Sequence, residues 1–385
     1  MKMLRLPRAK VQLGAPLPWS VRDDQGQLLL SRGHVVETEH QLDLLLERGA
    51  FVDVEEVKAV TSSQVTAQVE PRVERHLNLF GLWDQAERDL QQLLADAARG
   101  AALVEGIERL ALQVVNLVDN DADIAIYRCV RQEQVKTFYY GYAHVLHCAM
   151  LCILLSRYLT WPKERTNKLV KAALTMNLSI MDLQGQMAGQ DFPMRDKQRL
   201  QISEHPQRAH DQLVAAGVAD PDWLTAVIQH HERPDGTGYP MKETKLSEMA
   251  SILRLADVFM AKISPRALRP ALSAQEAARQ LFKEDNGGML STALVKQFGI
   301  YPPGDLVKLA SGELAVVVKR TANARAPIVA VITDKVEHLI AKTVRRDSAL
   351  AEFTITGIVS NKAILARLPP ERLYGFSEIA KPTAP

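Results

Sequence analysis

The sequence predicts a mainly α-helical protein in which a multi-helix bundle is flanked by a small α/β module and a small β subdomain. From about residue 75 to residue 300, segments with helical hydrophobic periodicity follow one another with only short polar breaks. Before and after this region, short runs rich in β-branched residues alternate with turn-forming residues. The length of 385 residues exceeds that of a typical single domain, so we expect two or three domains.

Residues 1–57 are expected to form the N-terminal α/β module. Residues 27–30 and 51–54 are short β-like runs. Residues 39–48 form an amphipathic helical segment, and Gly49 provides its stop. Strand-like and helical patterns in so short a stretch indicate a small mixed module.

Residues 58–74 are the predicted linker, because residues 61–70 form a polar stretch rich in Ser, Thr, Gln and Val. Residues 75–300 are the predicted helical domain. Amphipathic segments joined by short breaks pack as neighbours in a bundle, and the interior helices are expected to carry the chemistry. The strongest such segments are residues 82–98, 102–118, 122–135, 139–159 and 163–176.

Residues 301–385 are expected to form a C-terminal β-rich extension and tail. The strand-like runs are rich in β-branched residues and are separated by Ser-Gly and Asn-Ala-Arg-Ala-Pro turns. The Pro-rich end of the chain is expected to be frayed. The runs are residues 306–309, 314–319, 328–332 and 353–359.

The composition indicates a cytoplasmic globular protein and no general affinity for nucleic acid or membranes. The 47 basic and 45 acidic side chains leave a formal net charge of +2, too small to favour DNA or RNA as a partner. Cys129, Cys148 and Cys152 form no CxxC pair, and their odd number fits a reducing compartment, so we interpret them as buried small hydrophobic residues. The most apolar run, residues 145–159, is interrupted by polar residues and is too short for a membrane span, and the N-terminus has no signal-peptide pattern.

The most informative motif is Gln-His-His-Glu-Arg-Pro-Asp-Gly-Thr-Gly-Tyr-Pro at residues 229–240. It joins two adjacent histidines and a carboxylate to a glycine-rich turn, a combination suited to metal-dependent phosphate chemistry. The motif resembles the signature of the HD-GYP family of the HD superfamily, whose members are bacterial cyclic di-GMP phosphodiesterases. The resemblance extends over about residues 133–300 and implies a multi-helix HD-domain-like bundle.

The resemblance also implies a set of metal ligands in a fixed chain order. His144 is similar to the family's early histidine, and His205, which precedes a proline, is similar to its His-Pro ligand. His230 and His231 are the paired histidines of the signature, and Asp257 matches the final aspartate. The family uses two or more such metals to lower the pKa of bound water to about 7.

The His-Asp dyad of the family is missing from this chain. Asn177 and Leu178 stand at the dyad positions, and Met181 stands where members carry a phosphate-directed lysine. Leucine has no lone pair, and an asparagine oxygen does not replace an imidazole for iron, manganese or zinc. Tyr140 occupies a position where some members carry a glutamate ligand. We therefore expect no full bimetallic centre, and no confident catalytic residue can be named.

Substrate-facing residues of the family are matched more fully. Arg266 and Arg269 follow Asp257 at the family spacing and resemble the arginines that hold the phosphates of cyclic di-GMP. The glycines of the signature turn supply positive φ angles and its proline fixes the exit. The residues of this Gly-Tyr-Pro loop are Asp235, Gly236, Gly238, Tyr239 and Pro240.

Each of these residues also has a purely structural interpretation. Taken alone, His144 and His205 are more often buried or capping histidines, and the two arginines equally fit a solvated helix face. His147 lies one helical turn after His144 and is the remaining histidine with the best chance of a role. Asp182 would replace the lost dyad only through a helix irregularity.

We therefore expect a degenerate HD-GYP protein that binds cyclic di-GMP or a protein partner and has weak or absent phosphodiesterase activity. A second hypothesis is an active phosphodiesterase that works with one divalent transition metal, Fe, Mn or Zn, held by the remaining ligands. A third is a scaffold that binds no nucleotide and presents the Gly-Tyr-Pro loop, a docking element in the family, to regulators such as diguanylate cyclases.

Overall fold

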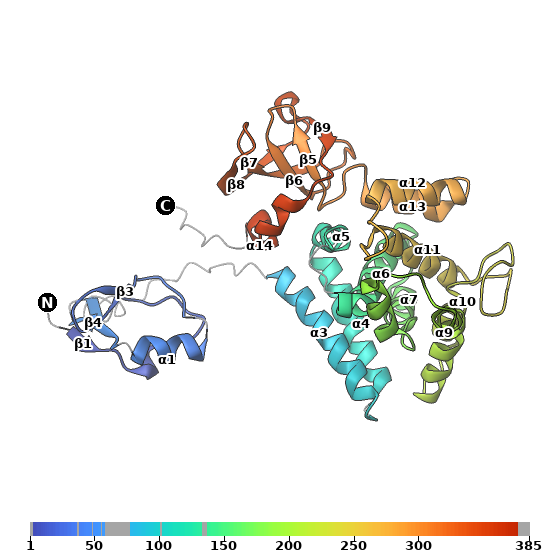
Figure 1. Cartoon of the computed structure of the whole chain (residues 1–385), viewed down its shortest axis with the longest axis horizontal. Coiled ribbons are helices and arrows are strands. Elements are labelled where there is room, and N and C mark those ends of the chain that lie inside the picture. Colours follow the sequence, from blue (N-terminus) through green and yellow to red (C-terminus); the bar gives the residue numbers. More distant parts are fainter. Residues whose placement is uncertain are drawn as a thin grey trace. The chain divides into compact units, whose positions relative to one another are not determined.

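The computed structural model describes residues 3–36, 38–47, 49–54, 56–57, 78–100, 102–132 and 137–375, and the chain divides into two compact units, Met1–Arg75 and His76–Pro385 (Figure 1). The mainly α-helical fold class predicted from the sequence is confirmed, with small sheets toward both ends of the chain. The predicted linker at residues 58–74 and the Pro-rich end after residue 375 lie outside the described residues.

The N-terminal unit is a small four-stranded antiparallel sheet with one helix. The strand order is β1-β4-β2-β3, formed by β1 (Met3–Arg5), β2 (Val21–Arg22), β3 (Leu28–Leu30) and β4 (Phe51–Asp53). Helix α1 (Glu39–Glu47) precedes Gly49, whose φ of 77° is the left-handed conformation that ends a helix. Leu6, Val21, Leu42 and Val52 belong to its separate hydrophobic core.

The second unit begins with helices close to the predicted segments. They are α3 (Leu79–Ala97), α4 (Leu103–Asn120), α5 (Ala122–Val130), α6 (Tyr140–Tyr158) and α7 (Lys163–Thr175). The prediction for α5 was too long, because Arg131 already leaves the helical conformation and the Gln132 side chain turns back to the Cys129 carbonyl.

Further helices complete the bundle. They are α8 (Met181–Gly189), α9 (Asp196–Ala215), α10 (Pro221–Gln229), α11 (Glu248–Ile263), α12 (Ala274–Glu284) and α13 (Met289–Phe298). Asp220 and Ser247 cap the N-termini of α10 and α11 with side-chain oxygens that accept backbone N–H bonds.

Helix α6 lies at the centre of the bundle and packs against α4, α7, α8, α11 and α13. It is buried along nearly its whole length because apolar residues occur on all of its sides. Residues Thr137–Tyr158 are long and apolar enough to cross a membrane, but 83% of the window is buried inside the protein, as in a core helix. Polar groups on such a helix must find partners within the protein.

The C-terminal part is a five-stranded antiparallel sheet of order β8-β7-β6-β5-β9. Its strands are β5 (Leu306–Leu309), β6 (Leu314–Lys319), β7 (Ile328–Thr333), β8 (Leu339–Asp347) and β9 (Ile355–Ile358). The sequence did not predict β8, whose side chains are largely polar and exposed at the sheet edge.

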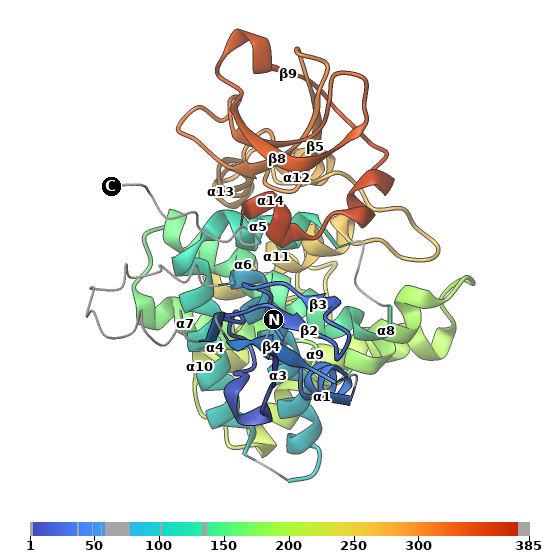
Figure 2. The ribbon, with the colours of Figure 1, turned by 90° about the vertical axis from the view of Figure 1, so that its left-hand side faces the viewer.

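The last helix contacts both the sheet and the helical bundle. Helix α14 (Pro370–Tyr374) lies below the sheet and next to α5 in both views (Figures 1 and 2). Tyr374 makes edge contacts with Phe80 and Tyr127, and Arg320 pairs with Asp123. A cavity of about 370 Å³, lined in part by Asp305 and Lys362, lies where the two parts meet.

Candidate metal centre

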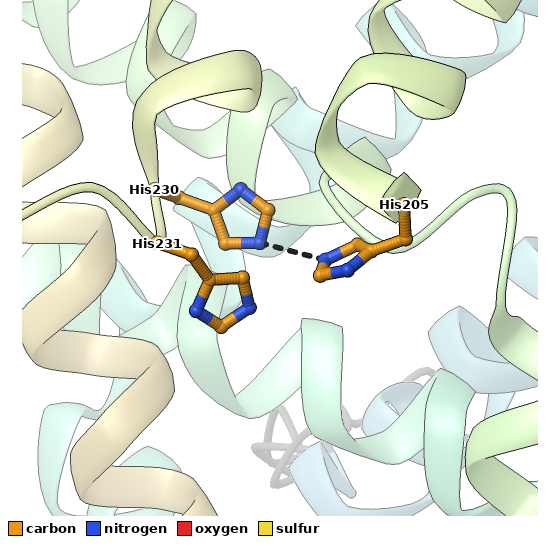
Figure 3. Close-up of side chains that lie close together, drawn as sticks. All are labelled: His205, His230 and His231. Atoms are coloured by element: carbon orange, nitrogen blue, oxygen red, sulfur yellow. Dashed lines mark hydrogen bonds between the residues drawn. The ribbon is translucent and has the colours of Figure 1, made fainter. Parts of the chain in front are cut away.

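Three histidines form one end of the candidate centre. His205 lies on α9, and His230 and His231 follow α10 directly (Figure 3). The Nε2 atoms of His205 and His230 are 3.1 Å apart, and the ring centroids of His230 and His231 are 4.2 Å apart. Two consecutive helices thus bring these rings together.

Local backbone chemistry orients two of these rings. Pro206 has no N–H, so it leaves the Ile202 carbonyl of α9 without its usual helical partner. His205 Nδ1 lies 2.6 Å from that Ile202 carbonyl oxygen. His230 Nδ1 lies 2.6 Å from the carbonyl oxygen of Val227, one of the last carbonyls of α10. In both rings Nε2 is consequently directed toward the centre.

The orientation determines which nitrogen carries the proton. Burial and the neighbouring His230 lower the pKa of His205 to about 3, and burial lowers the pKa of His230, so both rings are neutral at pH 7. A carbonyl oxygen only accepts, so the ring proton lies on Nδ1 of each. The two Nε2 lone pairs therefore face each other at 3.1 Å, an arrangement suited to a shared cation.

The other end of the centre contains a carboxylate and a further histidine. His144 on α6 places Nε2 2.8 Å from Oδ1 of Asp257 on α11. Asp257 Oδ2 lies 3.8 Å from His231 Nδ1, so this carboxylate joins the two ends. Among the described residues, the ion pairs of Asp257 involve only His144 and His231.

Asp257 is an ionised carboxylate in a buried place. Burial alone would raise its pKa, but the hydrogen bond from His144 and the nearby imidazoles of His231 and His230 outweigh burial and hold the pKa well below its usual range. Burial and His230 hold the pKa of His231 well below its usual value. A buried carboxylate surrounded by imidazole donors fits a divalent cation.

The five residues proposed as ligands therefore converge, whereas the dyad positions contribute nothing to either end. Asn177 lies in the turn after α7, 1% exposed, and neither its Oδ1 nor its Nδ2 has a hydrogen-bond partner. Leu178 packs against the hydrophobic core, and Met181 is buried at the start of α8. Asp182, considered as a substitute ligand, is exposed in the first turn of α8.

The Gly-Tyr-Pro loop is held beside the histidines by a buried glutamate. Glu232 is 0% exposed, and its carboxylate accepts the backbone N–H groups of Met241 at 2.6 Å and Glu243 at 3.1 Å. Gly238 is required because a Cβ there would lie 2.5 Å from the Arg233 nitrogen. Tyr239 then stacks on His231 with ring centroids 4.6 Å apart.

The remaining residues of the loop form a compact turn. The Asp235 carboxylate accepts the Thr237 N–H and hydroxyl, and Gly236 has a φ of 73°. The Tyr239–Pro240 peptide bond is cis. The turn itself is exposed at Asp235 and Thr237, so it offers polar groups to solvent next to the histidines.

The two arginines proposed for phosphate binding take different positions. The Arg266 guanidinium donates from Nη2 to the Tyr140 hydroxyl at 2.7 Å, and the Tyr140 ring stacks on His144. Arg269 donates to the backbone carbonyl of Ala261. Arg266 is thus linked through Tyr140 to the His144 and Asp257 end of the centre.

Two further residues near the centre were missed from the sequence. Cys148 places Sγ 3.6 Å from His144 Nε2 and shares a group of metal-type ligand atoms with His144 and Asp257. Arg254 lies on α11 one turn before Asp257, and burial lowers its pKa. In the sequence, Cys148 lies four residues after His144, and Arg254 lies three residues before Asp257. These helical spacings were the available indications that both residues face the centre.

His147 lies outside both groups of ligand atoms. It is buried, and burial lowers its pKa to about 3, with Arg128 and His144 adding to the shift. Cys129 Sγ contacts the His147 carbonyl. His147 lies on α6 away from the ligand atoms, so it belongs to the core around the centre.

The residues present fit a divalent transition metal. The described residues contain two groups of metal-type ligands, His205 with His230 and His231, and His144 with Cys148 and Asp257. Imidazole nitrogens with one carboxylate oxygen are donors that suit iron, manganese and zinc. Bound there, such an ion would act as a Lewis acid toward a phosphate oxygen.

The helical region of this chain is similar to known proteins. Residues 128–287 match the family described as HD domain. The chain is 28% identical over 230 residues to a protein from Pseudomonas aeruginosa that is named as a cyclic di-GMP phosphodiesterase. This match covers 58% of this chain and 53% of that protein. A match of 73 residues is 36% identical to a cyclic di-GMP phosphodiesterase from Vibrio cholerae, over 18% of this chain and 15% of that protein.

The chain thus spans about half the length of the Pseudomonas relative and less of the Vibrio relative. Among solved structures, an HDG"Y"P protein from Bdellovibrio bacteriovorus is similar with a TM-score of 0.47 and 15% sequence identity. That similarity covers 77% of this chain and 99% of that chain.

Proposed function

We propose that the helical domain of this chain is an HD domain of the HD-GYP type and that it binds cyclic di-GMP with weak or absent hydrolysis. The relatives named above are cyclic di-GMP phosphodiesterases, which supports a cyclic dinucleotide as the ligand class. We propose a cytoplasmic location, in agreement with the core position of the apolar helix α6.

One observation supports weak or absent hydrolysis more than any other. The dyad positions hold Asn177, whose amide atoms have no partner, and Leu178, which has no lone pair. Activation of water beside a phosphodiester depends on charge held close to that water. With Asp257 as the carboxylate among the ligands proposed here, the centre has less negative charge than a dyad-containing site.

We propose that one ion, iron, manganese or zinc, is held by the three-histidine group. The support is the pair of neutral imidazoles whose Nε2 lone pairs face each other at 3.1 Å. Nitrogen donors bonded to the same ion at about 2.0–2.1 Å and at right angles are about 3 Å apart, which matches this separation. Ion binding would therefore require little movement of His205 and His230.

Arginines near the centre support the binding of an anionic ligand. Arg266 is held by Tyr140 beside the His144 end, and Arg254 is partly buried on the same helix as Asp257. Arginine recognises phosphate through two parallel hydrogen bonds. In this proposal Arg266 and Arg269 bind the phosphates, while the Gly-Tyr-Pro loop borders the bound nucleotide.

The proposal is tested by measuring binding and hydrolysis on the same purified protein. Isothermal titration should detect cyclic di-GMP binding, and product analysis should find little or no linear dinucleotide or GMP. Arg266→Ala should weaken binding, whereas Arg199→Ala, an exposed arginine on α9, should not. Hydrolysis at an ordinary enzymatic rate with metal bound would contradict the proposal.

A restoration variant sharpens this test. Changing Asn177→His, Leu178→Asp and Met181→Lys together returns the imidazole, the carboxylate and the lysine to the positions where the family has them. If loss of these groups limits hydrolysis, the triple variant should gain cyclic di-GMP hydrolysis. Binding without any gain would show that another feature of the centre prevents the reaction.

A second candidate function is supported by the convergence of the five proposed ligands. His144, His205, His230, His231 and Asp257 lie together even without the dyad, so a one-metal phosphodiesterase is the alternative. It predicts that activity depends on the ion of the three-histidine group. His230→Ala would then abolish product formation, and unchanged activity in this variant would eliminate the alternative.

A further inference from the structure

We propose that His144, Cys148 and Asp257 form a second cation position in which Cys148 binds as a thiolate, selecting a soft or borderline ion such as Zn²⁺. This inference rests on the proposed function, because the second cation position belongs to the same centre. It adds a sulfur ligand to a site otherwise made of nitrogen and oxygen donors. Its ligand atoms form a group distinct from that of His205, His230 and His231, and Asp257 Oδ2 connects the two groups at 3.8 Å from His231 Nδ1.

The geometry comes from one turn of α6 and its neighbour α11. Cys148 lies four residues after His144, so both side chains lie on the same face of the helix. Cys148 Sγ is 3.6 Å from His144 Nε2, and that nitrogen is 2.8 Å from Asp257 Oδ1. The three ligand atoms lie within 4.8 Å of one another.

These separations are close to those between donors on a single ion. With bonds of about 2.3 Å to sulfur and about 2.0–2.1 Å to nitrogen, a tetrahedral centre places the two donors about 3.5 Å apart. The observed nitrogen-to-sulfur distance of 3.6 Å agrees with this value. In the same tetrahedral centre a nitrogen and an oxygen donor are about 3.4 Å apart. The observed nitrogen-to-oxygen distance of 2.8 Å must therefore lengthen by about half an ångström when an ion binds.

Hydrogen bonding alone does not satisfy the three groups. If His144 Nε2 carries the proton and donates it to Asp257, it has no lone pair left for the Cys148 thiol. If Nε2 instead accepts from the thiol, it has no proton for the ionised Asp257 carboxylate. His144 Nδ1 is buried with no partner in the described residues, so the ring gains nothing from the opposite tautomer.

A divalent ion removes this conflict. The His144 lone pair, the Asp257 carboxylate and a Cys148 thiolate then all face the same positive charge. The thiol proton is released to solvent as the sulfur-to-metal bond forms, and no redox step occurs. One carboxylate and one thiolate neutralise the dication, so the buried group carries no net charge.

The alternative is that Cys148 is only a core residue, like the other cysteines. Cys129 on α5 and Cys152 on α6 are equally buried, and Cys129 contacts the His147 carbonyl and the Met150 sulfur. Neither Cys129 nor Cys152 belongs to a group of ligand atoms. Cys152, one turn after Cys148 on α6, therefore serves as a matched control.

Cobalt titration of the metal-free full-length chain, kept reduced and anaerobic, tests the proposal. A thiolate bound to Co²⁺ gives a sulfur-to-metal charge-transfer band in the near ultraviolet, which imidazole and carboxylate ligands do not give. The parent protein and Cys152→Ser should show the band, and Cys148→Ser should lose it. Absence of the band from the fully loaded parent protein would overturn the inference without reference to any variant.

The same samples separate this inference from the proposed function. His230→Ala should bind less cobalt at the three-histidine group and keep the sulfur band. Cyclic di-GMP binding, followed by isothermal titration, reports on the proposed function alone. A folded Cys148→Ser protein that keeps the band would also overturn the inference, because another thiol would then be the ligand.

Discussion

Replacement of Asn177 by leucine should stabilise the protein, although it removes a polar group next to the candidate centre. Asn177 is 1% exposed, and its Oδ1 and Nδ2 have no hydrogen-bond partner. Burying an unpaired amide costs about 1–3 kcal/mol in proteins, and leucine has a similar size with no polar atoms. Asn177→Leu should therefore raise the free energy of unfolding by about 1–3 kcal/mol.

The assay is urea denaturation in the presence of a chelator, so that bound metal does not contribute. The variant should shift the midpoint upward with an unchanged slope. Asn116→Leu is the control, since Asn116 is exposed on α4 and its replacement should change stability by about 0.5 kcal/mol or less. A loss of stability in Asn177→Leu would refute the reasoning, because it would mean that the amide has a partner.

The same urea denaturation, repeated with bound metal, tests whether Asn177 is a metal ligand. If the Asn177 side-chain oxygen were a ligand, added Mn²⁺ would stabilise the parent protein more than Asn177→Leu. We expect Asn177→Leu to raise the free energy of unfolding by the same amount with and without Mn²⁺, because Asn177 is not among the five proposed ligands.

Three more outcomes follow from particular contacts. Gly238→Ala should lower the free energy of unfolding by about 1–3 kcal/mol, as measured by urea denaturation, because its Cβ would lie 2.5 Å from the backbone nitrogen of Arg233. Thr175→Val should cost about 1–3 kcal/mol in the same assay, because the buried Trp223 Nε1 would lose its 2.9 Å acceptor; an unchanged midpoint would contradict this. Burial raises the pKa of Asp305 to about 6, so its carboxyl contributes stability fully below about pH 4 and loses that contribution as the pH rises through about 6. The unfolding free energy of Asp305→Asn relative to the parent should accordingly rise by about 3 kcal/mol from about pH 4 to about pH 8, and a pH-independent difference would show that Asp305 does not titrate in this way.

The sequence predicted most elements of the fold because their patterns are local. The bounds of β5 and β6 agree with the predicted runs, since both strands are short, mostly apolar segments bounded by turn residues. The end of α5 was wrong because the Gln132 side chain competes with the helix for the Cys129 carbonyl. Strand β8 was missed because it forms through pairing with β7 and not through an apolar pattern of its own.

For the candidate centre, the motif order alone indicated His144, His205, His230, His231 and Asp257 as neighbours. Their roles as ligands remain predictions, but the structure does bring them together. The sequence also contained the reason for the His205 ring orientation, because a proline at the next position always leaves a helix carbonyl unpaired.

What the sequence by itself determined is the helical class, the resemblance to the HD-GYP signature and the absence of a His-Asp dyad at Asn177 and Leu178, since each is carried by residue types at fixed spacings. Only the tertiary structure decided that Cys148 faces the same space as Asp257 and that Arg266 is held by Tyr140. These contacts join different helices, and which faces meet depends on how whole side-chain surfaces pack, which no local pattern specifies.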